Sequence, residues 1–256
     1  MSKLFDLTGK TAVAIGGNSV LGSSISKGFA SHGAKVAIVG RNLEKAEAVV
    51  QEIEAEGGTA KAFSADVSSR ESLEKLVTEI ENWSGGFDIL LNAPGKNSAT
   101  PFFELDMDEW DDIMDVNLKG LVVTTQIFAK RMIEKGTQGS IINISSVSST
   151  TPLSKVFTYS VSKAGVNSMT QFLAREFAPH GIRVNAIIPG FFPAEQNRKI
   201  LSPERIESIM NHTPMNRFGS PEELQGAAVW LASEKASSFV TGTLIRVDGG
   251  FGSMTI

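Results

Sequence analysis

The sequence predicts an α/β fold, a single domain with a doubly wound parallel sheet of about seven strands and helices on both faces. Short apolar, β-branched runs alternate along the whole chain with longer segments of helical spacing. The runs are apolar throughout rather than at every second residue, as in strands that are covered on both faces. The 256 residues contain no repeat, low-complexity tract or linker, which favours one domain over 1–256.

Each element follows from this alternation. The predicted strands are Thr11–Ile15, Lys35–Val39, Ala60–Phe63, Phe87–Leu91, Ser140–Ile144, Arg183–Ile188 and Leu244–Val247. The predicted helices are Ser23–Ser31, Leu43–Glu54, Arg70–Trp83, Met107–Glu134, Tyr159–Phe177 and Pro221–Ala232. The alternation stops at Phe191–Ser220, which is richer in polar residues and prolines, and we interpret this section as an insertion over the ligand crevice.

Composition excludes several functional classes. A net charge of −4, with basic and acidic residues mixed along the chain, offers no nucleic-acid footprint and no polybasic membrane patch. The chain has no Cys, which excludes disulfides and thiolate chemistry. We expect no metal, because no His or carboxylate cluster has ligand spacing. Met1–Lys10 lacks the apolar core of a signal peptide and no apolar run is long enough to span a bilayer, so we expect a cytoplasmic protein.

A glycine-bearing turn follows the first predicted strand in AIGGNSVLGSS, Ala14–Ser24. Gly16 and Gly17 leave the strand and Gly22 starts the helix, whose free N–H groups suit a pyrophosphate. Val20 stands where a further glycine is expected, and Gly17 with Asn18 supplies the flexibility instead. This motif alone leaves two interpretations open, a dinucleotide site and a plain strand–turn–helix.

The end of the second predicted strand bears on the choice of cofactor. Gly40 in VAIVGRN stands where an acid would bind the ribose 2′-hydroxyl of NAD, and Arg41 follows it. A guanidinium suits a 2′-phosphate, although a solvated arginine at a strand end is equally compatible with the pattern. We therefore predict that NADP(H) is favoured and that NAD(H) is possible.

The chemistry-bearing residues cluster around YSVSK, Tyr159–Lys163. Four-residue spacing on a helix places the phenol and the ammonium on one face, where the lysine is expected to lower the pKa of the tyrosine. Tyr159 is the only tyrosine in the chain. Ser146 follows a buried strand in INISSVSS and is expected to point into the crevice at the strand ends. Asn117 lies inside a predicted helix, an unfavourable place for Asn that hints at a polar role.

With these motifs the chain resembles the short-chain dehydrogenase/reductase family over its whole length, and the resemblance implies a Rossmann-like fold. ADVS at Asp66, ILLNAPG at Ile89–Gly95, VNAIIPG at Val184–Gly190 and GTLIRVDGG at Gly242–Gly250 add to the match. The family's catalytic set falls on Asn117, Ser146, Tyr159 and Lys163. By this resemblance Tyr159 is the general acid in carbonyl reduction, Lys163 lowers its pKa and holds the nicotinamide ribose, Ser146 positions the carbonyl and Asn117 organises a relay water. The expected cofactor-binding residues are Gly16, Asn18, Ser19, Leu21, Gly22, Arg41, Asp66, Val67, Asn92, Ala93, Tyr159, Lys163, Pro189 and Gly190.

The chain also departs from the family pattern. Ile15 and Val20 replace a Thr and a Gly of the glycine loop, NAPG replaces NNAG at Asn92–Gly95, and Ala194 replaces a Thr that usually touches the cofactor. These changes affect the expected cofactor affinity rather than the chemistry.

The expected substrate is a small carbonyl compound or alcohol. Gly190–Arg198, His212–Leu224, the valine-bearing loop and GKN at Gly95–Asn97 resemble the branch of fructuronate reductases, or D-mannonate oxidoreductases. Lys96 and Arg198 are candidate partners for a substrate carboxylate, and Asn97, Gln196 and His212 for its hydroxyls. Each of these residues is also compatible with a plain solvated loop. The alternatives are a 3-oxoacyl-[acyl-carrier-protein] reductase and a dinucleotide-binding regulator without catalysis.

The resemblance further implies a homotetramer, in which the segments Met107–Glu134 and Tyr159–Phe177 pair across an interface. The first segment carries an apolar stripe at helical spacing, made of Ile113, Val116, Val123 and Ile127. The stripe fits either a subunit interface or the core of the chain itself.

Overall fold

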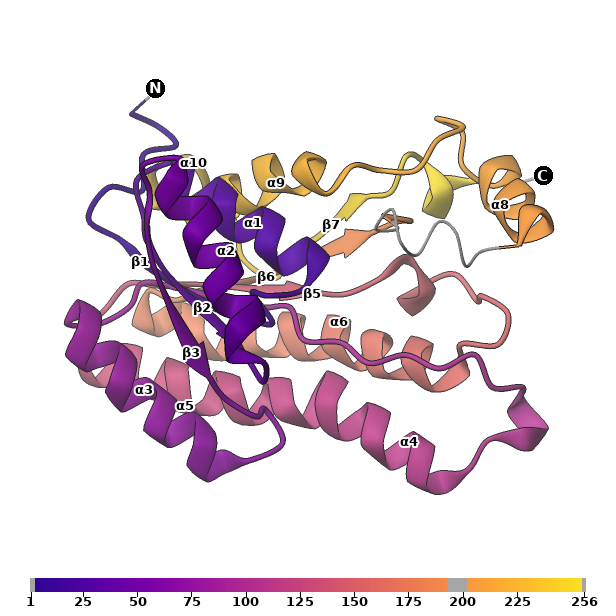
Figure 1. Cartoon of the computed structure of the whole chain (residues 1–256), viewed down its shortest axis with the longest axis horizontal. Coiled ribbons are helices and arrows are strands. Elements are labelled where there is room, and N and C mark those ends of the chain that lie inside the picture. Colours follow the sequence, from indigo (N-terminus) through magenta and orange to yellow (C-terminus); the bar gives the residue numbers. More distant parts are fainter. Residues whose placement is uncertain (1–2, 193–201, 255–256) are drawn as a thin grey trace.

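The computed structural model describes residues 3–192 and 202–254. Its centre is a sheet of seven parallel strands in the order β3-β2-β1-β4-β5-β6-β7 (Figure 1). The strands are β1 (Thr11–Ile15), β2 (Lys35–Gly40), β3 (Thr59–Ser64), β4 (Ile89–Asn92), β5 (Ser140–Ile144), β6 (Arg183–Pro189) and β7 (Leu244–Val247). All seven predicted strands are confirmed, three of them at both ends, and the single-domain, Rossmann-like fold class is confirmed with them.

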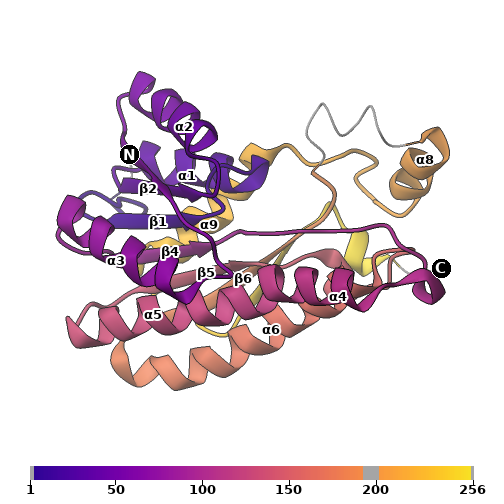
Figure 2. The same ribbon diagram turned by 60° about the horizontal axis from the view of Figure 1, so that its bottom comes forward.

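Helices cover both faces of the sheet. The described helices are α1 (Val20–Ser31), α2 (Leu43–Ala55), α3 (Arg70–Ser84), α4 (Met107–Met114), α5 (Gly120–Glu134), α6 (Phe157–Phe177), α8 (Pro203–Asn211), α9 (Gln225–Ala232) and α10 (Glu234–Ser237). The helices α1, α2 and α9 contribute to one core cluster, and α3, α5 and α6 contribute to the other. Figures 1 and 2 show α8 at one end of the molecule, apart from the helices that cover the sheet.

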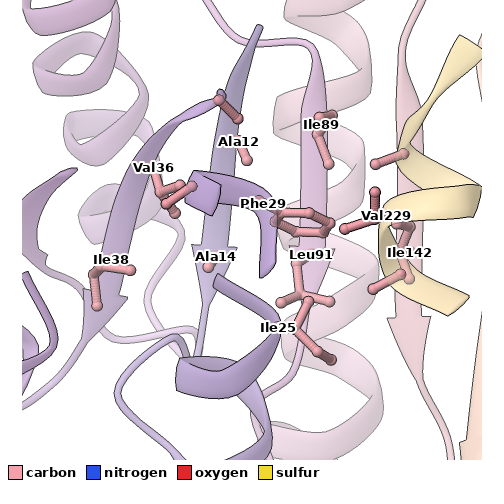
Figure 3. Packing of buried hydrophobic residues seen from close by; sticks show 14 of the residues in the cluster. Ala12, Ala14, Ile25, Phe29, Val36, Ile38, Ile89, Leu91, Ile142 and Val229 are labelled. Carbon is pink, nitrogen blue, oxygen red and sulfur yellow. The ribbon is translucent and has the colours of Figure 1, made fainter. Parts of the chain in front are cut away.

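The inner strands are largely apolar because they divide their side chains between two cores. In β1, Ala12 and Ala14 join the first core cluster, while Val13 and Ile15 join the second. Figure 3 shows the first cluster, in which Ile25 and Phe29 of α1 and Val229 of α9 pack over the strands. Burial of such side chains, at about 25 cal/mol per Å² of apolar area, is the main stabilising contribution to the layers.

The strand order reverses between β1 and β4. The chain passes from β1 outward to β3, returns to β4 on the other side of β1, and then continues outward to β7. At such a reversal two neighbouring connections leave on opposite faces, which opens a crevice at the carboxyl ends of the strands. The fold therefore places a ligand crevice beside the glycine-bearing turn that follows β1.

The structure corrects the predicted helix Met107–Glu134. It consists of α4 and α5, joined by one turn of π-helix over Asp115–Lys119. Hydrophobic spacing continues through this turn, so periodicity did not reveal it. A π-turn inside an α-helix is rare and occurs frequently at functional sites, and this one contains Asn117.

The apolar stripe on these helices packs partly into the chain's own core. Ile113 and Ile127 are buried, and Val123 packs against the same core cluster. Val116 lines a cavity at the carboxyl ends of the strands. Ile113 and Ile127 thus serve the chain's own core, and the interface interpretation of the half-buried Val116 and Val123 stays a prediction. Within the described residues, no helix combines the length and the apolar character that a membrane crossing requires.

Candidate active site

Two adjoining cavities form a groove over the carboxyl ends of the strands. The first is lined by the ends of β1 to β4, and its lining includes Gly16, Asn18, Arg41, Asp66 and Val67. The second lies over β5, β6 and the start of α6, and its lining includes Leu21, Ser146, Tyr159, Lys163, Pro189 and Gly190. Both cavities share Ser19, Ala93, Pro94 and Gly95, so the groove is continuous from the end of β2 to Tyr159.

The glycine-bearing turn is built as a dinucleotide cradle. Gly16 has φ +75°, and a Cβ there would lie 2.7 Å from the carbonyl carbon of Ala93. A Cβ at Gly22 would collide with the Gly16 carbonyl oxygen. The Ser19 hydroxyl donates to this oxygen (2.7 Å) and accepts from Gly22 N (3.2 Å), which caps α1. Only glycines fit at 16 and 22, and the residues of the turn fit a pyrophosphate at the N-terminus of α1.

Val20 does not disturb this cradle. It is the first residue of α1, and it is not among the residues with positive φ. Its side chain is exposed and borders the groove, between Ser19 and Leu21. The glycine expected at this position is therefore not needed for the backbone of this loop.

The end of β2 has room for neither an acid nor any other side chain. A Cβ at Gly40 would collide with the side chain of Asn18, whose amide donates to the Asn42 carbonyl (3.2 Å). Arg41 is exposed at the rim of the same cavity. The Asp66 carboxylate accepts from Ser68 N (2.9 Å), and so orders the turn after β3. This end of the groove thus has a glycine at the position where NAD-selective sites carry an acid, with Arg41 directly after it.

Tyr159 and Lys163 lie one turn apart on α6, at the other end of the groove. The Lys163 ammonium lies 5.6 Å from the centre of the Tyr159 ring and donates to the Ile144 carbonyl at the end of β5 (2.9 Å). The Tyr159 hydroxyl is hydrogen-bonded to the Ser146 side chain. A phenol, a hydroxyl and a cation thus line one end of the groove, as a carbonyl reduction requires.

A family model described as enoyl-(acyl carrier protein) reductase matches residues 16–252. An uncharacterised oxidoreductase of Bacillus subtilis (strain 168) is 42% identical over 96% of both chains. The chain belongs to the short-chain dehydrogenase/reductase family. It is therefore an oxidoreductase of this family.

Solved structures of similar proteins in this family carry nicotinamide cofactors. A putative D-mannonate oxidoreductase from Haemophilus influenzae with bound NAD is 37% identical, with a TM-score of 0.93 and coverage of 98% of this chain and 97% of that one. A gluconate 5-dehydrogenase from Burkholderia cenocepacia in complex with NADP and tartrate is 34% identical, with a TM-score of 0.92 and coverage of 98% of both chains.

Burial sets the charge states of Tyr159 and Lys163. It lowers the pKa of the Lys163 ammonium from 10.5 to about 8. Burial also raises the pKa of the Tyr159 phenol, and the hydrogen bond from Ser146 partly opposes this rise. The sequence predicted a tyrosine pKa lowered by Lys163, and the structure corrects this, because the ammonium lies over the ring and bonds a backbone carbonyl. The phenol is therefore protonated at neutral pH, as a general acid must be.

Asn117 is buried in the π-turn, and its amide is fully engaged. Its Oδ1 accepts from Lys96 N (2.7 Å), and its Nδ2 donates to Lys96 O (2.8 Å) and to the Ser162 hydroxyl (3.1 Å). The side chain thereby ties the loop after β4 to α6, next to Tyr159. Its role toward a relay water stays a prediction from the family resemblance.

Other predicted site residues lie below the groove or away from it. Gly22 packs under the turn, and the Asn92 amide donates to Thr125 (3.1 Å) and Asn143 (2.9 Å) in the core. The Lys96 ammonium pairs with Asp112 of α4. Asn97 accepts from Ser98 N (2.9 Å), and His212 Nδ1 lies 3.2 Å from the Ser208 carbonyl oxygen. Three further positions, Ala194, Gln196 and Arg198, lie outside the described residues.

The predicted site lacked some residues that line the groove or contact its side chains. Pro94 and Gly95 line both cavities, and the only signal for them was their place in NAPG directly after a strand. Ser148, two residues after Ser146, is buried and hydrogen-bonds the Ser146 hydroxyl. Its signal was the serine-rich stretch INISSVSS, in which spacing alone does not tell one hydroxyl from another.

Among the described residues, no group of three or more His, Asp or Glu side chains is arranged to hold a metal ion.

Proposed function

We propose that the protein is an NADP(H)-preferring oxidoreductase that interconverts a ketone and a secondary alcohol on a sugar acid. The observation that carries this proposal is the convergence of Ser146, Tyr159 and Lys163 at one end of the groove, with Arg41 at the other. The structural neighbours named for mannonate and gluconate favour a polyhydroxy acid as substrate.

The residues divide the work of carbonyl reduction. When bound, the nicotinamide cofactor supplies hydride to the carbonyl carbon. The Ser146 hydroxyl donates a hydrogen bond to the carbonyl oxygen and so holds it beside the Tyr159 hydroxyl. Tyr159 gives its proton to that oxygen as negative charge develops there. Lys163, whose ammonium is held by the Ile144 carbonyl (2.9 Å), is the residue that would hold the nicotinamide ribose. In alcohol oxidation the same proton returns to Tyr159.

We propose a six-carbon keto-uronate such as fructuronate as the substrate. Of the two predicted carboxylate partners, Lys96 is the weaker candidate, because its ammonium already pairs with Asp112. Arg198 remains the proposed partner, since charge-assisted pairing with a guanidinium is the strongest interaction available to a carboxylate.

One observation favours a second candidate, the 3-oxoacyl-[acyl-carrier-protein] reductase. A largely apolar cavity of about 500 Å³ lies beside the loop that joins Ser146 to Tyr159. Phe102, Leu153 and Phe157 are part of its lining, and they suit an acyl group better than a sugar acid.

A substrate panel separates these functions. Purified enzyme is assayed with NADPH and with NADH against D-fructuronate, 5-keto-D-gluconate, the neutral ketose D-fructose and an acetoacetyl thioester. We expect the highest kcat/KM for a keto acid with NADPH.

Tyr159→Phe keeps the ring and removes the proton donor, so it should lose about 100- to 10,000-fold in kcat.

Other outcomes of the panel have equally definite meanings. A far better turnover of the thioester would replace the sugar-acid proposal with the acyl reductase. Cofactor binding without turnover of any carbonyl compound would support the regulatory alternative. In a second step, Arg198→Met should lower kcat/KM for the keto-uronate and leave the neutral ketose nearly unchanged.

A further inference from the structure

The Ser146 hydroxyl has a buried neighbour whose position the reaction described so far does not use. Ser146 has extended backbone and caps a short 3-10 turn over Val147–Ser149. Ser148, in the middle of this turn, is 4% exposed. Its backbone N lies 3.2 Å from Ser146 Oγ, and its own Oγ lies 3.1 Å from the same atom.

Counting donors and acceptors shows what these two contacts do. A serine hydroxyl has one proton to donate and two lone pairs that accept. The N–H of Ser148 occupies one lone pair of Ser146, and the O–H of Ser148 occupies the other. With both acceptor sites filled from within the turn, the hydroxyl of Ser146 can take part in the groove only as a donor.

The donor role is the one that the chemistry needs. A carbonyl oxygen and a phenolate can only accept hydrogen bonds. A Ser146 hydroxyl with its lone pairs facing the groove would therefore repel these oxygens. Ser146 and Tyr159 line the same cavity, and a hydroxyl that donates to the phenol oxygen stabilises its charged form.

The neighbouring serines have other partners. Ser149 Oγ donates to the Ser146 carbonyl (2.6 Å) and accepts from Asn167 (2.8 Å), so it ties the backbone of the turn to α6. Ser145 Oγ donates to the Lys163 carbonyl (3.2 Å). These two hydroxyls hold backbone, whereas Ser148 bonds the reacting hydroxyl itself.

We propose that Ser148 is a positioning residue for carbonyl reduction, because it fills the acceptor sites of Ser146 and thereby fixes that hydroxyl as a donor, to Tyr159 in the free enzyme and to the substrate oxygen once substrate is bound. The catalytic part of this inference rests on the proposed function. The part that concerns Tyr159 does not, and it can be tested without any substrate.

The single tyrosine makes a direct test possible. Because Tyr159 is the only tyrosine of the chain, the ultraviolet absorbance of phenolate during a pH titration reports on this residue alone. In Ser148→Ala the Ser146 hydroxyl regains a free lone pair and donates to Tyr159 less of the time, so the pKa of Tyr159 should rise. Ser148→Thr keeps the hydroxyl and should restore the wild-type titration, whereas Ser149→Ala, the matched control, should leave the titration unchanged.

Kinetics give the second readout. Reduction requires protonated Tyr159, so kcat/KM falls at high pH, and in Ser148→Ala this alkaline limb should move to higher pH. At neutral pH kcat should fall about 3- to 10-fold, the effect of one neutral hydrogen bond, with KM and NADPH affinity nearly unchanged. Ser149→Ala should change thermal stability without moving the limb.

The two proposals fail in different ways. An unchanged Tyr159 titration in Ser148→Ala, or an equal shift in Ser149→Ala, would overturn the role of Ser148 even if the enzyme reduces keto acids. A shifted titration in a protein that reduces no carbonyl compound would retain the hydrogen-bond assignment and refute the proposed function.

Discussion

At the scale of single residues, Lys163 combines a catalytic position with a cost in stability. Lys163 is 2% exposed, and its ammonium donates to the Ile144 carbonyl. Burial lowers its pKa from 10.5 to about 8, so between these two pH values the unfolded chain holds a proton that the folded chain has lost. The free energy of unfolding therefore rises with pH through this window, by up to about 3 kcal/mol.

This linkage predicts the behaviour of Lys163→Met, which keeps most of the side-chain volume and removes the charge. Below pH 8 the variant should be the more stable protein, because it buries no cation. Its advantage should shrink by about 3 kcal/mol as the pH rises toward 10.5. Urea unfolding of both proteins across this range measures the difference, and an advantage that stays constant with pH would contradict the lowered pKa.

Arg41 is the residue on which the proposed cofactor preference depends. If it binds the 2′-phosphate, Arg41→Ala should weaken NADPH binding by about 1.5–3 kcal/mol, as expected for a charged hydrogen bond, with little effect on NADH. Fluorescence titration with both cofactors measures this. Lys45→Ala, which removes an exposed cation from the first turn of α2, is the control and should change neither affinity. Equal losses for the two cofactors in Arg41→Ala would exclude recognition of the 2′-phosphate.

At the scale of elements, the turn between β1 and α1 depends on space as much as on backbone angle. Gly16 and Gly57 have similar backbone angles, φ +75° and +81°. A Cβ at Gly57 would meet nothing within 4 Å, whereas one at Gly16 would lie 2.7 Å from the Ala93 carbonyl. Comparing the two substitutions therefore separates backbone strain from steric blockage of the cradle.

Gly57→Ala should cost about 1–2 kcal/mol of stability, as expected for an L-residue in the left-handed region, and should bind NADPH normally. Gly16→Ala carries the same strain and also pushes β1 away from the loop after β4, so it should lose both more stability and cofactor binding. Thermal unfolding and a binding titration on both variants test this. If Gly16→Ala bound NADPH as tightly as Gly57→Ala, the cradle would not be the cofactor site.

Comparing the predicted elements with the observed ones shows which features the sequence alone does not predict. The strands were predictable because burial on both faces leaves continuous apolar runs such as Thr11–Ile15. The π-turn at Asp115–Lys119 was not, because one extra residue in a turn leaves the apolar spacing nearly unchanged. Asn117 was flagged as polar, but its clamp on Lys96 joins residues 21 positions apart and depends on tertiary packing. The sequence also predicted that the pKa of Tyr159 is lowered, whereas burial raises it. Burial depends on tertiary packing and is not visible in a YxxxK motif.

At the scale of the whole molecule, the question is which surface joins subunits. In the apolar stripe, Ile113 and Ile127 are buried inside the chain and Val116 borders the groove. The outer surface of the same helical layer carries other large apolar side chains. On α6, Phe172 is 61% exposed, and Met107 at the start of α4 is 58% exposed. Exposed aromatic and methionine side chains are enriched at protein interfaces.

We propose that α6 pairs with its counterpart in a homotetramer and that Phe172 lies in this interface. Light scattering should give a tetramer for the wild type at micromolar concentration. Phe172→Glu places a charge where an apolar contact is expected, so it should shift the protein to a smaller species. Thr78→Glu, on the exposed side of α3, is the control and should remain tetrameric. A monomeric wild type would refute the assembly, and a tetramer that tolerates Phe172→Glu would refute the role of α6, since a buried unpaired carboxylate is too costly for such an interface to accept.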